Sequence, residues 1–167
     1  DGIRDYKVTG VQTCALPILL PAMLLIGAEL RTTNQECAQT IPPFWGSWIA
    51  ENKGAQIKNK VDASVTLGVY TNYHQPFNVA TDPYSLIIGS PVTSADAVPA
   101  GFVKHSIPAA KYAVFTARGP IGTAVYQAWQ EVWQTQLERI FTSDFEWYHA
   151  QSTNDENSIV KVYIAIK

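Results

Sequence analysis

The sequence predicts an α+β fold of duplicated β-α-β-β units, in which two helices pack on one antiparallel sheet and leave a central ligand cleft. Two patterns indicate this fold: two segments have helical apolar spacing, and the order strand, helix, strand, strand occurs twice. Composition is the third indication, because 47% hydrophobic and 16% charged residues in a chain of 167 are typical of one globular domain.

The first unit begins with a β-favouring segment from Ala22 to Thr33, after which residues 34–38 turn the chain. We expect a helix next, reaching about Asn52, with Pro42 and Pro43 in its first turn, where a missing N–H is tolerated. Its apolar face consists of Ile41, Phe44, Trp45, Trp48 and Ile49. The alternating runs 65–73 and 84–91 then predict an antiparallel pair of strands.

The second unit begins with extended segments at 102–107 and 111–117, the second of which ends at Gly119 and Pro120. A helix of about four turns follows. Its face at helical spacing consists of Val125, Trp129, Val132, Trp133, Gln136 and Ile140. Segments 145–151 and 158–167 are expected to be strands that are joined by the polar loop 152–157.

The first eighteen residues, DGIRDYKVTGVQTCALPI, have neither helical nor strand periodicity. They resemble translated sequencing-adaptor read-through, so we expect residues 1–18 to be non-native and 19–167 to form the domain. The native N-terminus, with any upstream DNA-binding domain, would then be missing. A secretory signal is the alternative, because Arg4 and Lys7 precede an apolar run, but Pro17 and Pro21 interrupt that run. The run is shorter than the about 20 residues of a membrane span, and a cytoplasmic location is expected.

Charge and cysteine content argue against several function classes. A formal net charge of −2 gives no electrostatic basis for nucleic-acid binding by this chain. Cys14 lies in the segment that we set aside, which leaves Cys37 as a structural residue. The histidines lack companions at metal-ligand spacing, so we expect no metal and no cofactor. No Ser or Cys neighbour forms a nucleophile pair with His105 or His149.

Several segments together resemble one family: LLIGAELRTTN, VTLGVYTNY, YSLIIGSPV, SIPAAKYAVFTARGP, AVYQAWQEVW, TSDFEWYHA and VYIAIK. The chain resembles the GyrI-like or AraC-type effector-binding domain, including its stand-alone, integron-cassette-like branch, over nearly all of residues 23–167. The resemblance implies a duplicated α+β domain that binds small, often cationic and amphipathic molecules in a cleft with a buried acid. Glu146 matches that acid. The chain lacks a helix-turn-helix, so it is not expected to regulate transcription alone.

Strand periodicity places Glu146 and Tyr148 on one face and Phe145 and Trp147 on the other. A carboxylate among aromatic rings is expensive to bury, so a ligand cation would compensate it, and burial without ligand should raise its pKa. Candidate ligand-binding residues are therefore Glu146, Tyr148, Tyr70, Tyr163, Trp129 and Trp45, with Tyr112 either in the pocket or in the core.

A structural explanation competes with this one at each position. Glu146 could pair with Lys161 or Lys111 on a neighbouring strand. Most of the helix tryptophans are expected to be core residues whatever the function: Trp45, Trp48, Trp129 and Trp133.

We expect a binding module without enzymatic activity, namely a sensor or sequestering protein for cationic amphipathic compounds. A homodimer or a regulator partner is compatible with that role. Two alternatives are a hydrolase of cyclopropane-type compounds that uses Glu146, and a protein-interaction module like the inhibitors of DNA gyrase.

Overall fold

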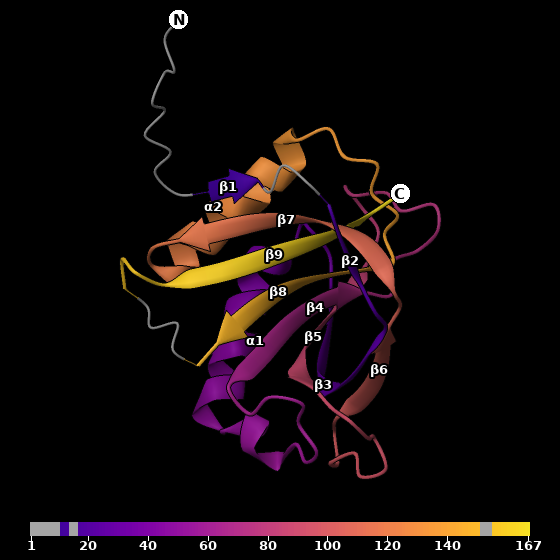
Figure 1. Ribbon diagram of the computed structural model, residues 1–167, viewed down its shortest axis with the longest axis vertical. Helices are drawn as coiled ribbons and strands as arrows, with labels where there is room; N and C mark the ends of the chain where they lie inside the picture. Colours follow the sequence, from indigo (N-terminus) through magenta and orange to yellow (C-terminus); the bar gives the residue numbers. More distant parts are fainter. Residues whose placement is uncertain (1–10, 14–16, 151–154) are drawn as a thin grey trace, which may run out of the picture.

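The computed structural model describes residues 11–13, 17–150 and 155–167 (Figure 1). Its strands are β1 (Val11–Thr13), β2 (Ile18–Leu20), β3 (Met23–Thr32), β4 (Val65–Thr71), β5 (Tyr84–Pro91), β6 (Val103–Ile107), β7 (Ala110–Arg118), β8 (Ser143–His149) and β9 (Ile159–Ile166). Its helices are α1 (Cys37–Ala50), the short 3₁₀ helix η1 (Lys53–Gln56) and α2 (Ile121–Gln134).

The strands form one antiparallel sheet in the order β1-β7-β9-β8-β4-β5-β3-β6, and β2 also pairs with β7. The units β3-α1-β4-β5 and β7-α2-β8-β9 meet where β4 pairs with β8. Outward from this central pair the order is β5 and β3 on one side and β9 and β7 on the other. This symmetry confirms the predicted duplication, with β6 added outside β3.

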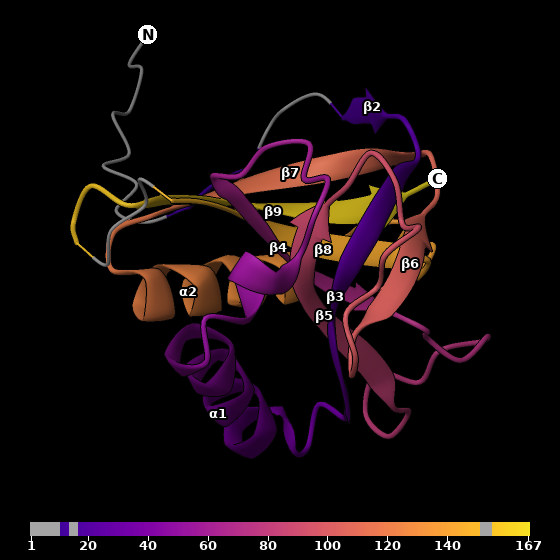
Figure 2. The same ribbon diagram turned by 90° about the horizontal axis from the view of Figure 1, so that it is seen from below.

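Both helices lie on the same side of the sheet (Figure 2). Trp48 of α1 packs in one core cluster with Ile88 of β5, and Ala128 of α2 packs in a second cluster with Val162 of β9. A third cluster, which contains Phe145, fills the opposite face. The middle of the sheet, between the two cores covered by helices, is therefore the place where a cleft can form.

The first helix differs from the prediction at its start. It begins at Cys37, inside the expected turn, so Pro42 and Pro43 lie in its second turn and not its first. Both prolines are exposed. Water can therefore hydrogen-bond the carbonyl groups that lose their helical donors, and this explains why the helix tolerates them.

The second helix is shorter than its sequence pattern predicts. It ends at Gln134, and Thr135 already has an extended backbone, so Gln136 and Ile140 are not on the helix. Ile140 packs against the core on the opposite face of the sheet. The spacing of Ile140 from the helix residues is therefore coincidental. Ile140 is apolar because it packs in the core on the opposite face of the sheet and not because it belongs to the helix.

The predicted strands all form, with bounds that differ by up to two residues, whereas β1 and β2 were not predicted. β5 has the expected bounds, whereas β4 ends at Thr71 because Asn72 adopts a left-handed backbone with φ of 54°. Residues 151–154 lie outside the described residues. They include the last residue of the predicted strand 145–151 and the first three residues of the predicted loop 152–157. Within the described ranges, no helix is long and apolar enough to cross a membrane.

Candidate functional site

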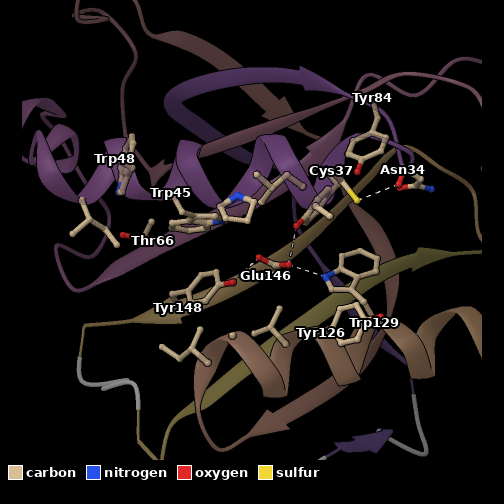
Figure 3. Close-up of a pocket in the computed structure, with 18 of the residues that line it drawn as sticks. Asn34, Cys37, Trp45, Trp48, Thr66, Tyr84, Tyr126, Trp129, Glu146 and Tyr148 are labelled. Carbon is tan, nitrogen blue, oxygen red and sulfur yellow. Dashed lines mark hydrogen bonds between the residues drawn. The ribbon is translucent and has the colours of Figure 1, made fainter.

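A cavity of about 710 Å³ lies between α1 and α2, over β4 and β8 (Figure 3). Trp45 of α1 and Trp129 of α2 form parts of its walls, and Tyr70, Glu146 and Tyr148 rise from the strands below. The cavity thus takes residues from both units. Its volume is in the range of pockets that hold drug-sized ligands.

Glu146 is the central polar residue of this cavity, although its side chain is only 2% exposed. Three neutral donors hold the carboxylate (Figure 3). The Tyr70 hydroxyl donates to Oε1 at 2.9 Å, and the Trp129 indole N–H donates to the same oxygen at 2.7 Å. The Tyr148 hydroxyl donates to Oε2 at 2.6 Å. The carboxylate is therefore oriented by β4, α2 and β8 together.

Strand pairing and one glycine make room for this arrangement. Tyr148 lies two residues after Glu146 on β8, and Gly68 of β4 is paired directly opposite Glu146. A Cβ at Gly68 would lie 3.0 Å from Glu146 Oε2 and 3.1 Å from Trp45 Cζ2. Because these distances are tighter than ordinary contacts, glycine at this position allows the carboxylate and the α1 indole to sit together.

Glu146 carries an uncompensated charge when it is ionised. Burial raises its pKa, and the three hydrogen bonds oppose this by favouring the ionised form. In the part of the chain that the structure describes, no Lys, Arg or His forms an ion pair with it. The predicted alternative partners are therefore wrong: Lys161 is exposed and paired opposite Trp147, and Lys111 donates to the backbone oxygen of Lys167.

Aromatic rings surround the carboxylate. Trp45 meets Tyr148 edge to face with centroids 5.0 Å apart, and Trp129 meets Tyr70 in the same way at 4.9 Å. Burial raises the pKa of the Tyr70 and Tyr148 hydroxyls, and the negative charge of Glu146 raises it further. Both hydroxyls therefore remain donors at neutral pH. Ring faces beside a carboxylate form surroundings that attract a cation.

A second buried carboxylate, Asp144, lies two residues before Glu146 and so on the same face of β8. Arg139 Nη2 donates to its Oδ2 at 2.7 Å, and the Tyr73 hydroxyl donates to the same oxygen at 2.8 Å. The backbone N–H of Ala165 donates to Oδ1 at 2.8 Å. Arg139 therefore balances Asp144, whereas nothing of opposite charge balances Glu146 among the described residues.

The structure brings most of the predicted ligand-binding residues to the cavity, namely Glu146, Tyr148, Tyr70, Trp129 and Trp45. Tyr112 and Tyr163 do not line it. Tyr163 is paired with Phe145 and stacks on its ring at 4.7 Å, and Tyr112 contacts the same ring at 5.2 Å. Both tyrosines thus share the face of Phe145, which is opposite to that of Glu146. Ligand contact by the five residues at the cavity stays a prediction.

Trp133 departs from the prediction that most of the helix tryptophans are core residues. Trp48 is buried, as expected, but Trp133 is 52% exposed at the edge of the cavity. Arg139, Tyr73 and Tyr84 also line the cavity, and the sequence analysis missed them. Because side chains two residues apart on a strand share a face, the position of Glu146 predicts that Asp144 lies on the same side of β8. No such local pattern connects Arg139 to either acid.

His149 has a serine neighbour in the structure. The Ser64 hydroxyl lies 2.9 Å from His149 Nε2 at the cavity wall. However, Ser64 donates to Asp62 Oδ1 at 2.6 Å, so its single hydroxyl hydrogen is not directed at the histidine. Asp62, Ser64 and His149 therefore form a chain of polar contacts at the edge of the cavity. In an activated nucleophile the serine hydroxyl would donate to the histidine, and here it donates to Asp62.

The family model Cass2, described as integron-associated effector binding protein, matches residues 18–166. The chain belongs to this family. The resemblance to stand-alone effector-binding domains of transcription-regulator relatives is thereby confirmed.

Two bacterial regulators are similar in sequence. YobU of Bacillus subtilis, named as a transcriptional regulator protein, is 31% identical over 147 residues, which cover 84% of this chain and 90% of YobU. The transcriptional regulator BrlR of Pseudomonas aeruginosa is 29% identical over 153 residues, 87% of this chain. The match covers 53% of BrlR, so this chain spans about half the length of that regulator.

Two solved structures have the same fold. The integron cassette protein VCH_CASS2, from the mobile metagenome of Vibrio cholerae, has a TM-score of 0.70 at 25% identity, covering 95% of this chain and 96% of that one. SAV2435, which was solved bound to tetraphenylphosphonium, has a TM-score of 0.76 at 21% identity, covering 93% and 94%. At that identity, the second likeness shows the fold alone.

Proposed function

We propose that this chain binds a lipophilic cation in the cavity between α1 and α2, as a stand-alone sensor or sequestering module for such compounds. One observation carries the proposal: Glu146 is 2% exposed at the cavity and has no ion-pair partner among the described residues. Burial removes the hydration of the carboxylate, and its three neutral hydrogen-bond donors supply no counter-charge. A cation in the cavity supplies the missing counter-charge.

The other cavity residues favour a cation over ligands of different charge. Tyr70, Tyr148 and Trp129 are neutral donors that orient the carboxylate without cancelling its charge. A neutral ligand of the same shape gains apolar contacts but leaves the carboxylate unpaired, and an anion adds repulsion. Each ring that faces the cation adds about 0.5–2 kcal/mol.

Two other functions make different demands on Glu146. Hydrolysis of a cyclopropane-type compound requires its carboxylate to activate water, yet both of its oxygens already accept hydrogen bonds. A protein-interaction function like that of gyrase inhibitors makes no demand on a side chain that is this deeply buried. Substitution of Glu146 therefore separates the proposed function from the interaction alternative.

Tetraphenylphosphonium is a suitable probe, because SAV2435 shares the fold and was solved with this cation bound. Tryptophan fluorescence and calorimetry would be used to titrate the wild type, Glu146→Gln and the control Glu138→Gln, which makes the same charge change at an exposed position. We expect saturable binding to the wild type and the control. Glu146→Gln should bind at least about tenfold more weakly, since a charge-assisted contact is lost. Equal binding to all three proteins would refute the proposal.

A further inference from the structure

Arg139 forms a second polar point on the cavity wall, in the connection between α2 and β8. Its side chain is 13% exposed, and its guanidinium carbon lies 4.4 Å from the centroid of the Phe141 ring. The ion pair with Asp144 and the contact with Phe141 hold the plane of the guanidinium in one orientation. Arg139 is therefore a preorganised group and not a freely moving surface charge.

Most of the hydrogen-bonding capacity of Arg139 is unused. A guanidinium has five N–H donors, and in the described ranges only Nη2 meets an acceptor, Asp144 Oδ2. Nε is buried without an acceptor, and no hydrogen bond joins Nη1 to any described residue. Nε has almost no accessible surface, so a ligand can reach only the Nη groups. Because an unpaired donor in a partly buried site is costly, an acceptor that a ligand brings to Nη1 gains more than it does in water.

The charge balance decides which kind of acceptor fits. Arg139 is already paired with Asp144 at 2.7 Å, so this end of the cavity has no net charge to attract an anion. Glu146 lies two residues after Asp144 on β8, about 7 Å from it along the strand, and repels negative groups. A neutral acceptor such as a ketone, ester or amide carbonyl uses the free donors without opposing Glu146.

We infer that Arg139 is a specificity-determining residue, and that the preferred ligands combine a lipophilic cation with a neutral hydrogen-bond acceptor about 7 Å or more from the charge. This inference rests on the proposed cation site at Glu146 and adds a requirement on the rest of the ligand. The acceptor receives its hydrogen bond from Arg139, while the cation faces Glu146 and its aromatic neighbours.

A matched pair of probes tests the inference. Heptyltriphenylphosphonium carries only the cation and a hydrocarbon chain, and its counterpart carries a ketone on the sixth carbon of that chain. Calorimetry would measure both affinities for the wild type, for Arg139→Lys and for Arg139→Met combined with Asp144→Asn. The combined variant removes both charges together, because Arg139→Met alone would leave Asp144 buried and unpaired. Circular dichroism would check that each variant folds.

We expect the wild type to bind the ketone probe about tenfold more tightly than the heptyl probe, which corresponds to one charge-assisted hydrogen bond. In the combined variant this ratio should fall to about one, and Arg139→Lys should give an intermediate ratio because it keeps the charge but loses the planar donors. Equal affinities in the wild type, or an unchanged ratio in the combined variant, would overturn the inference.

Titrating Glu146→Gln with both probes separates this inference from the proposed function. If the wild type binds the ketone probe through Arg139 but Glu146→Gln binds it equally well, the acceptor site stands and the cation site fails. If the wild type binds the heptyl probe as tightly as the ketone probe and Glu146→Gln binds neither, the cation site stands and the acceptor site fails. Binding of neither probe would overturn both.

Discussion

Replacing Glu146 by Gln is expected to make the protein more stable while it weakens cation binding. The Gln Oε1 can accept hydrogen bonds from Tyr70 and Trp129, which now donate to the carboxylate Oε1 at 2.9 and 2.7 Å. Its Nε2 can donate to the Tyr148 hydroxyl oxygen, which now lies 2.6 Å from Oε2. The variant therefore keeps the contacts of the native side chain and removes only the buried charge.

The direction of the pKa shift sets the pH range of this effect. Burial raises the pKa of Glu146 above its ordinary value of 4.5, so the folded protein keeps a proton that the unfolded chain has already lost. Stability from this group is fully present below the unfolded pKa and is lost as the pH rises through the folded pKa. Gln has no such loss, so the variant gains its advantage above that window and not below it.

The size of the gain follows from the desolvation cost that stays uncompensated at Glu146, which has hydrogen-bond donors but no counter-ion, and we take this cost as about 1–3 kcal/mol. For a domain of this length, each kcal/mol corresponds to about 2–4 °C in Tm. Differential scanning calorimetry at pH values of about 4 and 8, on either side of the ordinary pKa of 4.5, would compare the wild type with Glu146→Gln and with the exposed control Glu138→Gln. A variant that is less stable than the wild type at the higher pH would show that the ionised carboxylate stabilises the fold, and would refute this reasoning.

Other substitutions test separate parts of the structure. Arg139→Met alone leaves the buried Asp144 unpaired, and urea unfolding should show a loss of about 3–5 kcal/mol, part of which Asp144→Asn restores. Gly68→Ala places a Cβ 3.0 Å from Glu146 Oε2, so calorimetry should show about tenfold weaker phosphonium binding; unchanged affinity would contradict the crowding. Tyr163→Phe, on the opposite face, should leave that affinity unchanged. Deleting residues 1–18, which we propose to be non-native, should leave a folded domain by circular dichroism, and an unfolded product would refute that assignment.

Local periodicity was enough to predict much of the fold and part of the site. The alternation of β8 placed Glu146 and Tyr148 on one face, and the structure has them there together. The repeated order of strands and helices predicted two units, and the symmetric order of the sheet around β4 and β8 agrees with it. These predictions succeeded because the side chains of one strand or helix are related by a fixed geometry.

Predictions that joined different elements were less reliable. Tyr163 was assigned to the pocket from its chemistry, but its pairing with Phe145 puts it on the other face. A shift of one residue in that pairing would have reversed the outcome, and the turns between strands do not reveal the register. Ile140 was assigned to a helix by its spacing, although it belongs to the core beneath the sheet.

The sequence by itself determined the duplicated α+β fold, the strand that carries the acid and the side of that strand on which the acid lies. The tertiary structure alone decided that Tyr70, 76 positions away in the chain, donates to Glu146. It likewise decided that Arg139 balances Asp144 and that no cation reaches Glu146 among the described residues. The physical reason is that periodicity orients side chains within an element, whereas strand register and helix packing determine which charges meet and which remain for a ligand.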